Sequence, residues 1–209
     1  MTIAIVANKS QTSEILSFKK VPQGVRMEII EKPQESDLNK FDGVFILDTD
    51  YKYIAEAVSP TIPVIINSVT ITLRESGLPS NFSRLNAWNG FLSRTVYEVA
   101  SSDFPLARKI FDNLQWDIIQ VKDEPGLVAA RVVCMIINEA YFALEDELSS
   151  AKEIDSAMKF GTNYPLGPFE WAEKIGHVNV YSLLRKLSAI DSRYEVSPLL
   201  LKQIPVSER

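Results

Sequence analysis

The hydrophobic pattern of the chain changes once, near residue 123, and this change limits the folds that the chain can adopt. Before that point, short apolar runs rich in β-branched residues alternate with helical or turn segments. Beyond it, the apolar residues recur at helical spacing. Strands separated by helices favour parallel pairing, and short continuous apolar strands favour burial on both sheet faces. We therefore expect a parallel α/β domain over residues 1–122 and a helical domain over residues 123–209.

Seven strands are expected in the first half, with helices between some of them. The strands are expected at residues 3–7, 25–30, 44–47, 62–66, 85–88, 95–99 and 116–121, and the helices at 12–18, 51–58 and 104–114. Between Glu31 and Asp42 the chain has room only for a loop.

The second half is expected to be helical throughout. The predicted helices cover residues 126–148, a segment after Ser150, and residues 168–175, 180–187 and 198–203. Pro125 suits the start of the first of these, where a missing N–H costs nothing. Ser150 and Glu153 have the spacing of a capping box, and Gly161 is expected to end the following helix in the left-handed conformation. The first helix is apolar on several sides, which favours a central position or a subunit contact.

Composition narrows the classes of partner. The chain has 209 residues, a formal net charge of -5 and no basic run, which argues against nucleic acid. No apolar stretch approaches the roughly 20 residues that span a bilayer, and residues 1–6 suit a first strand better than a signal peptide. The single cysteine, Cys134, is expected to be a buried, inert thiol in a cytoplasmic protein. One cysteine and one histidine, His177, do not make a typical zinc site.

Several short motifs follow one another in the second half. They are Pro125-Gly126, Arg131, Asn138-Glu139-Ala140, Ile154-Asp155-Ser156-Ala157 and the run Tyr164-Pro165-Leu166-Gly167-Pro168-Phe169-Glu170. In this order and spacing they resemble the C-terminal domain of the 3-hydroxyacyl-CoA dehydrogenases, an all-α domain of the 6-phosphogluconate dehydrogenase C-terminal type. The resemblance implies a Rossmann-like domain before it. This domain is pruned, because the family usually has a helical excursion where residues 31–42 leave room only for a loop. The resemblance also implies a role in fatty-acid metabolism, an acyl-CoA-type ligand, NAD as cofactor and a homodimer formed through the helical domain.

The resemblance also implies positions for the cofactor, and several of them are altered. The family's Gly-x-Gly-x-x-Gly loop falls on Ala7, Lys9 and Thr12. The second glycine normally lets the backbone approach the pyrophosphate, so a side chain at Lys9 should obstruct it, although its ammonium could bind a phosphate in another geometry. Glu31 falls on the acid that binds the adenine ribose, and Asp50 lies near the acid that follows the third strand.

Further positions concern the nicotinamide and the substrate. Asn67-Ser68-Val69-Thr70 resembles the family's Asn-Thr-Ser-Ser turn, which makes Asn67 a candidate cofactor contact and Ser68 and Thr70 candidate substrate contacts. Arg131 falls on the arginine of the family's Asn-Arg pair and is a further substrate candidate. The asparagine of that pair, which touches the substrate in the family, falls on Ala130.

The catalytic segment departs furthest from the family. Residues 84–91 resemble the lead-in to the family's histidine, and Asn89 falls on that histidine. Glu98, in the following strand, falls on the glutamate that orients the histidine. An amide does not titrate near neutral pH, so Asn89 cannot act as a general base. Glu98 is the remaining candidate for that role.

Three functions are consistent with these residues. The first is a degenerate 3-hydroxyacyl-CoA dehydrogenase, a pseudoenzyme kept as a binding or assembly protein, with weak or no NAD binding. The second is an active NAD(P)-dependent oxidoreductase on a 3-hydroxyacyl-CoA or related hydroxy acid, with Glu98 or a bound water as base. The third is a non-catalytic subunit that pairs with a complete dehydrogenase. The joint loss of the glycines, the histidine and one asparagine favours the first.

Overall fold

The computed structural model describes residues 1–31, 33, 37–48, 51 and 54–209. Contacts divide the chain into two units, Met1–Leu127 and Val128–Arg209. This division falls a few residues after the boundary that the sequence predicts.

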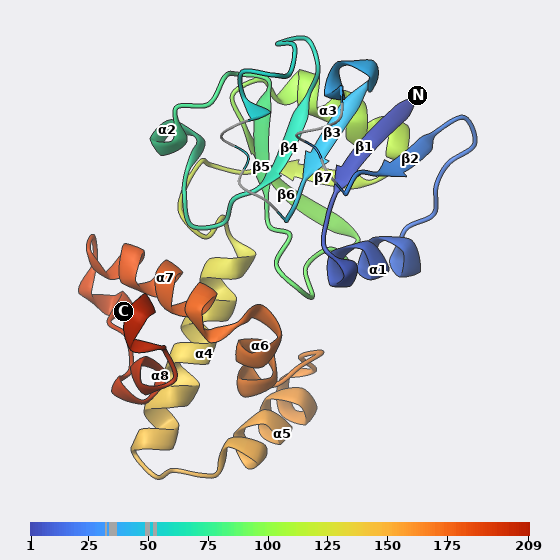
Figure 1. Ribbon diagram of the computed structural model, residues 1–209. Coiled ribbons are helices and arrows are strands. Elements are labelled where there is room, and N and C mark those ends of the chain that lie inside the picture. Colours follow the sequence, from blue (N-terminus) through green and yellow to red (C-terminus); the bar gives the residue numbers. More distant parts are fainter. Residues whose placement is uncertain (32, 34–36, 49–50, 52–53) are drawn as a thin grey trace. The chain divides into compact units, whose positions relative to one another are not determined.

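Among the described residues of the first unit, seven strands form one sheet in the order β2-β1-β3-β4-β5-β6-β7 (Figure 1). The strands are β1 Thr2–Val6, β2 Arg26–Ile29, β3 Gly43–Ile46, β4 Val64–Asn67, β5 Phe82–Leu85, β6 Val96–Ser101 and β7 Asp117–Gln120. Pairing is parallel from β2 through β5 and between β6 and β7, but β6 is antiparallel to β5. The predicted parallel sheet is therefore confirmed, with one antiparallel pair between β5 and β6. The connection from β5 to β6 contains no helical crossover, and a short return of that kind produces antiparallel pairing.

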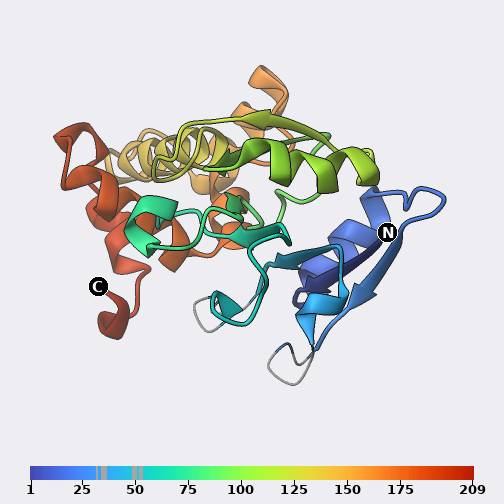
Figure 2. The same ribbon diagram turned by 90° about the horizontal axis from the view of Figure 1, so that it is seen from above.

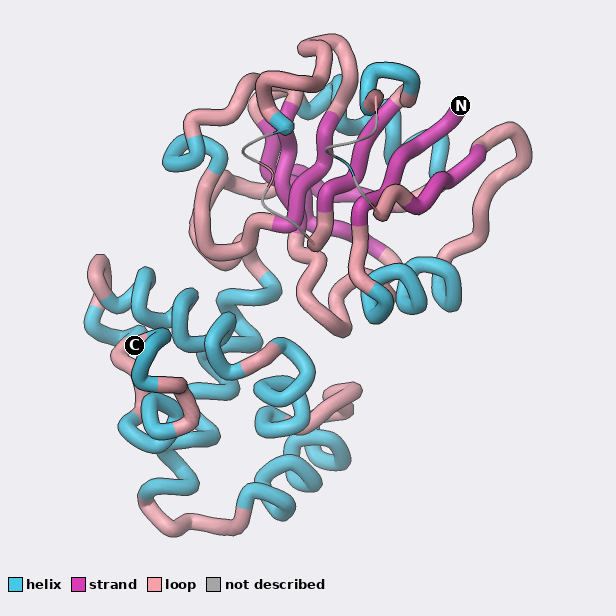
Figure 3. The backbone as a smooth tube through the Cα atoms, in the orientation of Figure 1, coloured by secondary structure: helices cyan, strands magenta, loops and turns pink. Residues whose placement is uncertain are grey.

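The two faces of the sheet are covered differently (Figure 3). One face packs against α1 Lys9–Phe18 and α3 Phe104–Leu114, whose Ile15 and Phe111 join the core under the sheet. The other face is covered by the 3-10 helix η2 Leu38–Lys40, by the segment from Ile54 to Ile62 and by the short α2 Leu73–Ser76. The described part of residues 51–58 forms turns, so the helix expected there is not seen in it.

The second unit is helical, as the sequence predicts (Figure 2). It contains α4 Ala129–Glu145, α5 Ala151–Thr162, α6 Pro168–Ile175, α7 His177–Ser188 and α8 Pro198–Lys202, with short 3-10 turns η4 Ser192–Tyr194 and η5 Val206–Glu208. The helix α4 contacts each of the other four, so it is the central element of the unit. Within the described residues, no helix is long and apolar enough to cross a membrane.

Three local expectations are corrected by the backbone. The first helix of this half begins at Ala129 and not at residue 126, because Gly126 (φ 82°) and Leu127 (φ 51°) are left-handed, and Pro125 consequently lies before the helix. Gly161 does not end α5. The helix continues to Thr162, and Asn163 takes the left-handed conformation (φ 58°).

The family motifs of the second half act together to join helices. Asp155 on α5 is buried, and its Oδ1 accepts a hydrogen bond of 2.8 Å from the backbone N–H of Phe169 at the start of α6. A Cβ on Gly167 would lie 2.2 Å from that oxygen, so only glycine fits there. Asn138 on α4 likewise donates to the carbonyl of Glu195 and accepts from the N–H of Ser197, at 2.7 and 2.9 Å. These contacts explain why the motifs occur together.

Candidate functional site

The candidate site lies at the carboxyl ends of β1, β3, β4 and β5. Four parallel strands end here, and open α/β sheets bind ligands in the crevice at this edge. The segment after β1 leads directly into α1, whose first turn therefore borders the crevice.

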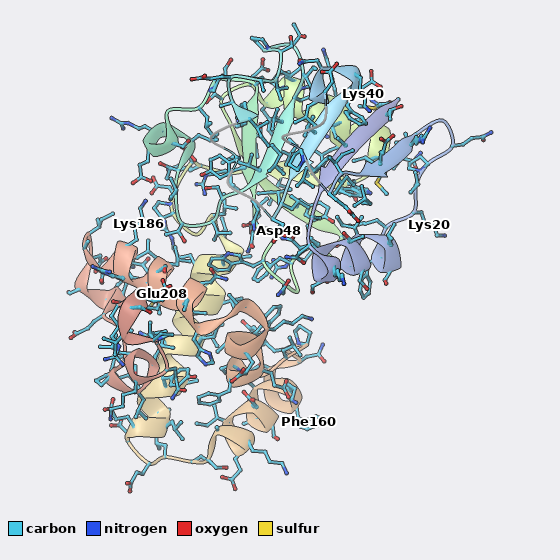
Figure 4. The ribbon with its side chains drawn as sticks, viewed as in Figure 1. Lys20, Lys40, Asp48, Phe160, Lys186 and Glu208 are labelled. Atoms are coloured by element: carbon cyan, nitrogen blue, oxygen red, sulfur yellow. The ribbon has the colours of Figure 1, made fainter. Side chains whose placement is uncertain are left out.

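The first turn of α1 is capped by its own side chains. Asn8 Oδ1 accepts a hydrogen bond of 2.9 Å from Gln11 N, and Gln11 Oε1 accepts one of 3.1 Å from Asn8 N. A helix N-terminus binds phosphate through such N–H groups. Asn8 Nδ2 also donates to the carboxylate of Asp48, at 2.9 Å, which brings a negative charge to this helix end (Figure 4 labels Asp48). The capped turn is a poor anion site.

Gln11, in this turn, is bonded to the segments that follow two strands of the sheet. Its side chain is 3% exposed, and its Nε2 donates to the carbonyl oxygens of Leu47, at 2.9 Å, and Ala87, at 3.0 Å. Asn67 makes a parallel link: Nδ2 donates to Leu47 O at 3.1 Å, and Oδ1 accepts from Ala87 N at 2.9 Å. Two amides thus join the segments that follow β3 and β5. Gln11 is not among the residues predicted from the sequence, although the capping-box spacing of Asn8 and Gln11 is visible there.

An open groove of about 760 Å³ lies between α1 and β2. It is lined by Lys9 and Glu31, the two residues predicted at the cofactor's ribose and phosphate, and by Ala7 and Thr12 at the altered glycine positions. The structure therefore brings Lys9 and Glu31 to one surface. Asp50, the third predicted cofactor contact of the first half, lies outside the described residues.

The turn after β4 holds the predicted substrate contacts. Ser68 is buried, its Oγ donates to the carbonyl of Ile71 at 2.7 Å, and it lies 3.2 Å from the hydroxyl of Tyr51. The Ser68 hydroxyl is thus engaged within its own turn. Thr70 is half-buried, and no polar partner for its side chain is found among the described residues. Arg131 is half-buried on α4, in the second unit.

A fully buried arginine fixes this turn. Arg84 on β5 donates from Nη1 to Ser68 O at 3.0 Å, from Nη2 to Glu124 O at 2.6 Å and from Nε to Asp123 Oδ1 at 2.5 Å. The Asp123 carboxylate also accepts from the first N–H groups of α2. Burial by itself would raise the pKa of Asp123, but the hydrogen bonds from Arg84 and these N–H groups outweigh it and hold that pKa below its usual range.

The two residues at the family's catalytic positions are placed on neighbouring segments. Asn89 is half-buried in the loop after β5, where the next N–H, of Gly90, donates to Glu14 of α1 at 3.1 Å. Glu98 is half-buried on β6. Burial lowers the pKa of Arg94, and the charge of Glu98 partly offsets that effect, so Glu98 has a guanidinium for its neighbour.

The chain's only imidazole is in the other unit. His177 Nε2 lies 2.8 Å from the hydroxyl of Tyr141 on α4, where burial raises the pKa of Tyr141 to about 12. Cys134 is fully buried, as expected, and burial raises the pKa of its thiol. Among the described residues there is no group of histidine, cysteine and acidic side chains that could hold a metal ion.

The comparison with protein families covers the helical unit. Residues 126–206 match the model of the 3-hydroxyacyl-CoA dehydrogenase C-terminal domain. The helical unit belongs to the 3-hydroxyacyl-CoA dehydrogenase C-terminal domain family. It is 43% identical over 70 residues to 3-hydroxyadipyl-CoA dehydrogenase of Escherichia coli K12, a match that covers 34% of this chain and 15% of that protein. It is 31% identical over 117 residues to 3-hydroxybutyryl-CoA dehydrogenase of Bradyrhizobium diazoefficiens, covering 54% and 40%. The chain thus matches less than half the length of these curated relatives.

Solved structures of this family share the fold of both units. The (S)-3-hydroxybutyryl-CoA dehydrogenase PaaH1 of Ralstonia eutropha superposes with a TM-score of 0.71 at 20% identity, covering 96% of this chain and 92% of that one. FadB2 of M. tuberculosis superposes with a TM-score of 0.73 at 14% identity and the same coverage. The chain therefore has a Rossmann-like domain followed by a helical domain of the dehydrogenase type.

Proposed function

We propose that this protein binds an acyl-CoA-type ligand in acyl-CoA metabolism and does not carry out NAD-dependent turnover. The observation that carries the proposal is the pair of links that Gln11 and Asn67 make across the strand ends. The acyl-CoA class is supported by the match of the helical unit to the 3-hydroxyacyl-CoA dehydrogenase C-terminal domain, and by relatives that are 3-hydroxyadipyl-CoA and 3-hydroxybutyryl-CoA dehydrogenases.

The energetic argument concerns the pyrophosphate of NAD. To reach the first turn of α1 it would have to displace the Asn8–Gln11 capping box and lie against a side chain at Lys9. Losing an N-cap costs about 0.5–2 kcal/mol. A cost of about 1.4 kcal/mol weakens affinity tenfold, so displacing the cap would weaken NAD binding by roughly tenfold.

The catalytic positions support the same proposal. Asn89 cannot accept a proton in place of an imidazole. Glu98 has the guanidinium of Arg94 as a charged neighbour, and the imidazole that this glutamate orients in the family is replaced by Asn89. Loss of a general base alone commonly costs about 10²–10⁴-fold in rate.

We further propose that the protein is a homodimer in the cytoplasm, formed through the helical unit. Val128 and Val132, one helical turn apart, are 52% and 50% exposed at the start of α4. Two exposed valines at helical spacing suit a contact between two copies of this face.

Calorimetry tests the proposal directly. NADH and, separately, acetoacetyl-CoA would be titrated into the purified protein, with an established 3-hydroxybutyryl-CoA dehydrogenase as the positive control. We expect acetoacetyl-CoA to bind, and NADH to give no heat of binding up to millimolar concentration. Binding of NADH at micromolar concentration, together with reduction of acetoacetyl-CoA, would contradict the proposal.

The alternative is an active oxidoreductase with Glu98 as base. The groove lined by Lys9 and Glu31 favours this alternative, because the predicted contacts of the cofactor's phosphate and adenine ribose then lie on one surface. The two functions differ in one measurement: reduction of acetoacetyl-CoA by NADH that is abolished by Glu98→Gln supports the alternative only.

A further inference from the structure

Asn86, immediately after β5, has a buried amide nitrogen with no hydrogen-bond partner among the described residues. The residue is 7% exposed, and its Oδ1 accepts a hydrogen bond of 2.9 Å from Trp88 N. Because a backbone N–H can only donate, this bond identifies the oxygen and therefore the orientation of the amide. A buried donor without a partner destabilises a fold, and native proteins contain few of them. Such a group calls for a functional reason.

The register of the sheet locates this donor. Asn67 pairs with Leu85, so Asn86 lies beside Ser68, at the ends of β4 and β5. On the other side Arg84 pairs with Ala100, and continuing that antiparallel register by two residues sets Asn86 opposite Glu98. Asn86 therefore lies between the substrate turn and the strand that carries Glu98, at the edge where such sheets bind ligands.

Because side chains alternate along a strand, Asn86 lies on the face of the sheet opposite the core that packs against α1 and α3. Leu85 and Ala87 belong to the core on the α1 and α3 side of the sheet. Arg84 reaches the opposite side, toward Ser68 and Val69, and Asn86 shares that side by alternation. The donor is neutral, and the extended register sets its residue opposite Glu98. A carbonyl oxygen suits this position better than a phosphate or carboxylate, because an anion would be repelled by Glu98.

We propose that the Asn86 amide donates a hydrogen bond to the thioester carbonyl of the bound acyl-CoA, and that Glu98 accepts one from a hydroxyl at C3. This inference rests on the proposed function and names the two groups of the chain that recognise a 3-hydroxyacyl chain. Asn86 acts here as a binding residue, and no chemical step is assigned to it.

The test compares two ligands that differ at the carbonyl. They are butyryl-CoA and the thioether S-butyl-CoA, which lacks the carbonyl. A separate comparison of 3-hydroxybutyryl-CoA with butyryl-CoA isolates the hydroxyl. We expect the wild-type protein to bind butyryl-CoA about tenfold more tightly than S-butyl-CoA. In Asn86→Ser, whose hydroxyl can still accept from Trp88 N, this preference should disappear while S-butyl-CoA binds as before.

Two further variants guard against an effect on folding alone. Asn86→Asp keeps the acceptor for Trp88 N and removes the donor, so it should lose the same preference. Asn81→Ala removes a buried asparagine of the same segment whose Nδ2 is bonded to Ile62 O. It should lower the melting temperature and keep the preference.

The outcomes distinguish the two proposals. If Asn86→Ser and Asn86→Asp fold and retain the preference for the carbonyl, the inference is wrong and the proposed function stands. If the wild-type protein binds none of these CoA derivatives, the proposed function fails and the inference fails with it. Glu98→Ala should abolish the difference in affinity between 3-hydroxybutyryl-CoA and butyryl-CoA. An unchanged difference would show that Glu98 does not bind the C3 hydroxyl.

Discussion

Gln11, in the first turn of α1, donates a hydrogen bond of 3.0 Å to the backbone carbonyl of Ala87, 76 positions later in the chain. The same nitrogen reaches Leu47 after β3, so a single amide joins three segments of the sheet's carboxyl edge. In the dehydrogenase family this edge is expected to receive the dinucleotide. Here side chains of the protein satisfy the backbone groups that border it.

Gln11→Ala should lower the free energy of unfolding by about 1–3 kcal/mol, because it removes the side-chain donor to Ala87 O, one of the two side-chain donors to Leu47 O and half of the capping box. Urea unfolding measures the change. Gln23→Ala, at an exposed position, is the matched control and should stay within about 0.5 kcal/mol of the wild type. Equal stability of the two variants would mean that the link contributes little.

Gly167→Ala should destabilise the helical unit by about 1–3 kcal/mol, because the new Cβ would meet Asp155 Oδ1 at 2.2 Å and displace the cap of α6. Gly161→Ala is the matched control. It lies inside α5 with no atom within 4 Å of the new Cβ, and alanine in a helix gains about 0.5–1 kcal/mol over glycine. Opposite shifts in melting temperature are expected, and a loss of stability in both variants would contradict this reading.

The Arg84–Asp123 pair predicts a dependence of stability on pH. The pKa of Asp123 is lower in the folded protein than in the unfolded chain, so the folded state favours the carboxylate. Its contribution is complete above the unfolded pKa of about 3.9 and is lost as the pH falls through the folded value.

Urea midpoints of the wild type and Asp123→Asn, measured from pH 7 down to pH 3, provide the test. The wild type should be the more stable at pH 7, and the difference should shrink toward pH 3. Asp112→Asn removes an exposed carboxylate paired with Arg108 and should show little difference at any pH. A constant difference for Asp123→Asn across this range would exclude the proposed linkage.

Val132→Glu should convert the proposed dimer into a monomer, because it introduces a charge into the centre of an apolar contact. Light scattering after size-exclusion chromatography measures the mass. Val206→Glu, at a position that is 82% exposed near the end of the chain, is the control and should leave the mass unchanged. A wild-type monomer, or a Val132→Glu dimer, would contradict the proposed contact.

Local patterns in the sequence were sufficient for much of the fold. The helix predicted at residues 104–114 is observed with those bounds, and the capping box at Ser150 forms as its spacing predicts. Both depend on neighbours within one turn of helix, which the sequence places without help from the rest of the chain. The family motifs of the second half were likewise readable, and Gly167-Pro168 among them shapes the start of α6.

Other boundaries depended on backbone conformation that the composition does not reveal. Leu127 adopts a left-handed conformation that favours glycine, and Asn163 takes the place expected for Gly161. Such positions are set by the contacts of the flanking helices, so propensity alone placed both helix ends incorrectly.

By itself, the sequence determined that the chain has an α/β half and a helical half, that both resemble one dehydrogenase family, and that the glycines and histidine expected of that family are replaced. Only the tertiary structure decided which side chains bond to one another at the carboxyl edge of the sheet. Gln11 is bonded to Leu47 and Ala87, Asn67 to the same two residues, and the Asn86 amide has no partner among the described residues. These relationships join residues far apart in the chain, and they exist because the strand order brings their carboxyl ends to one edge of the sheet.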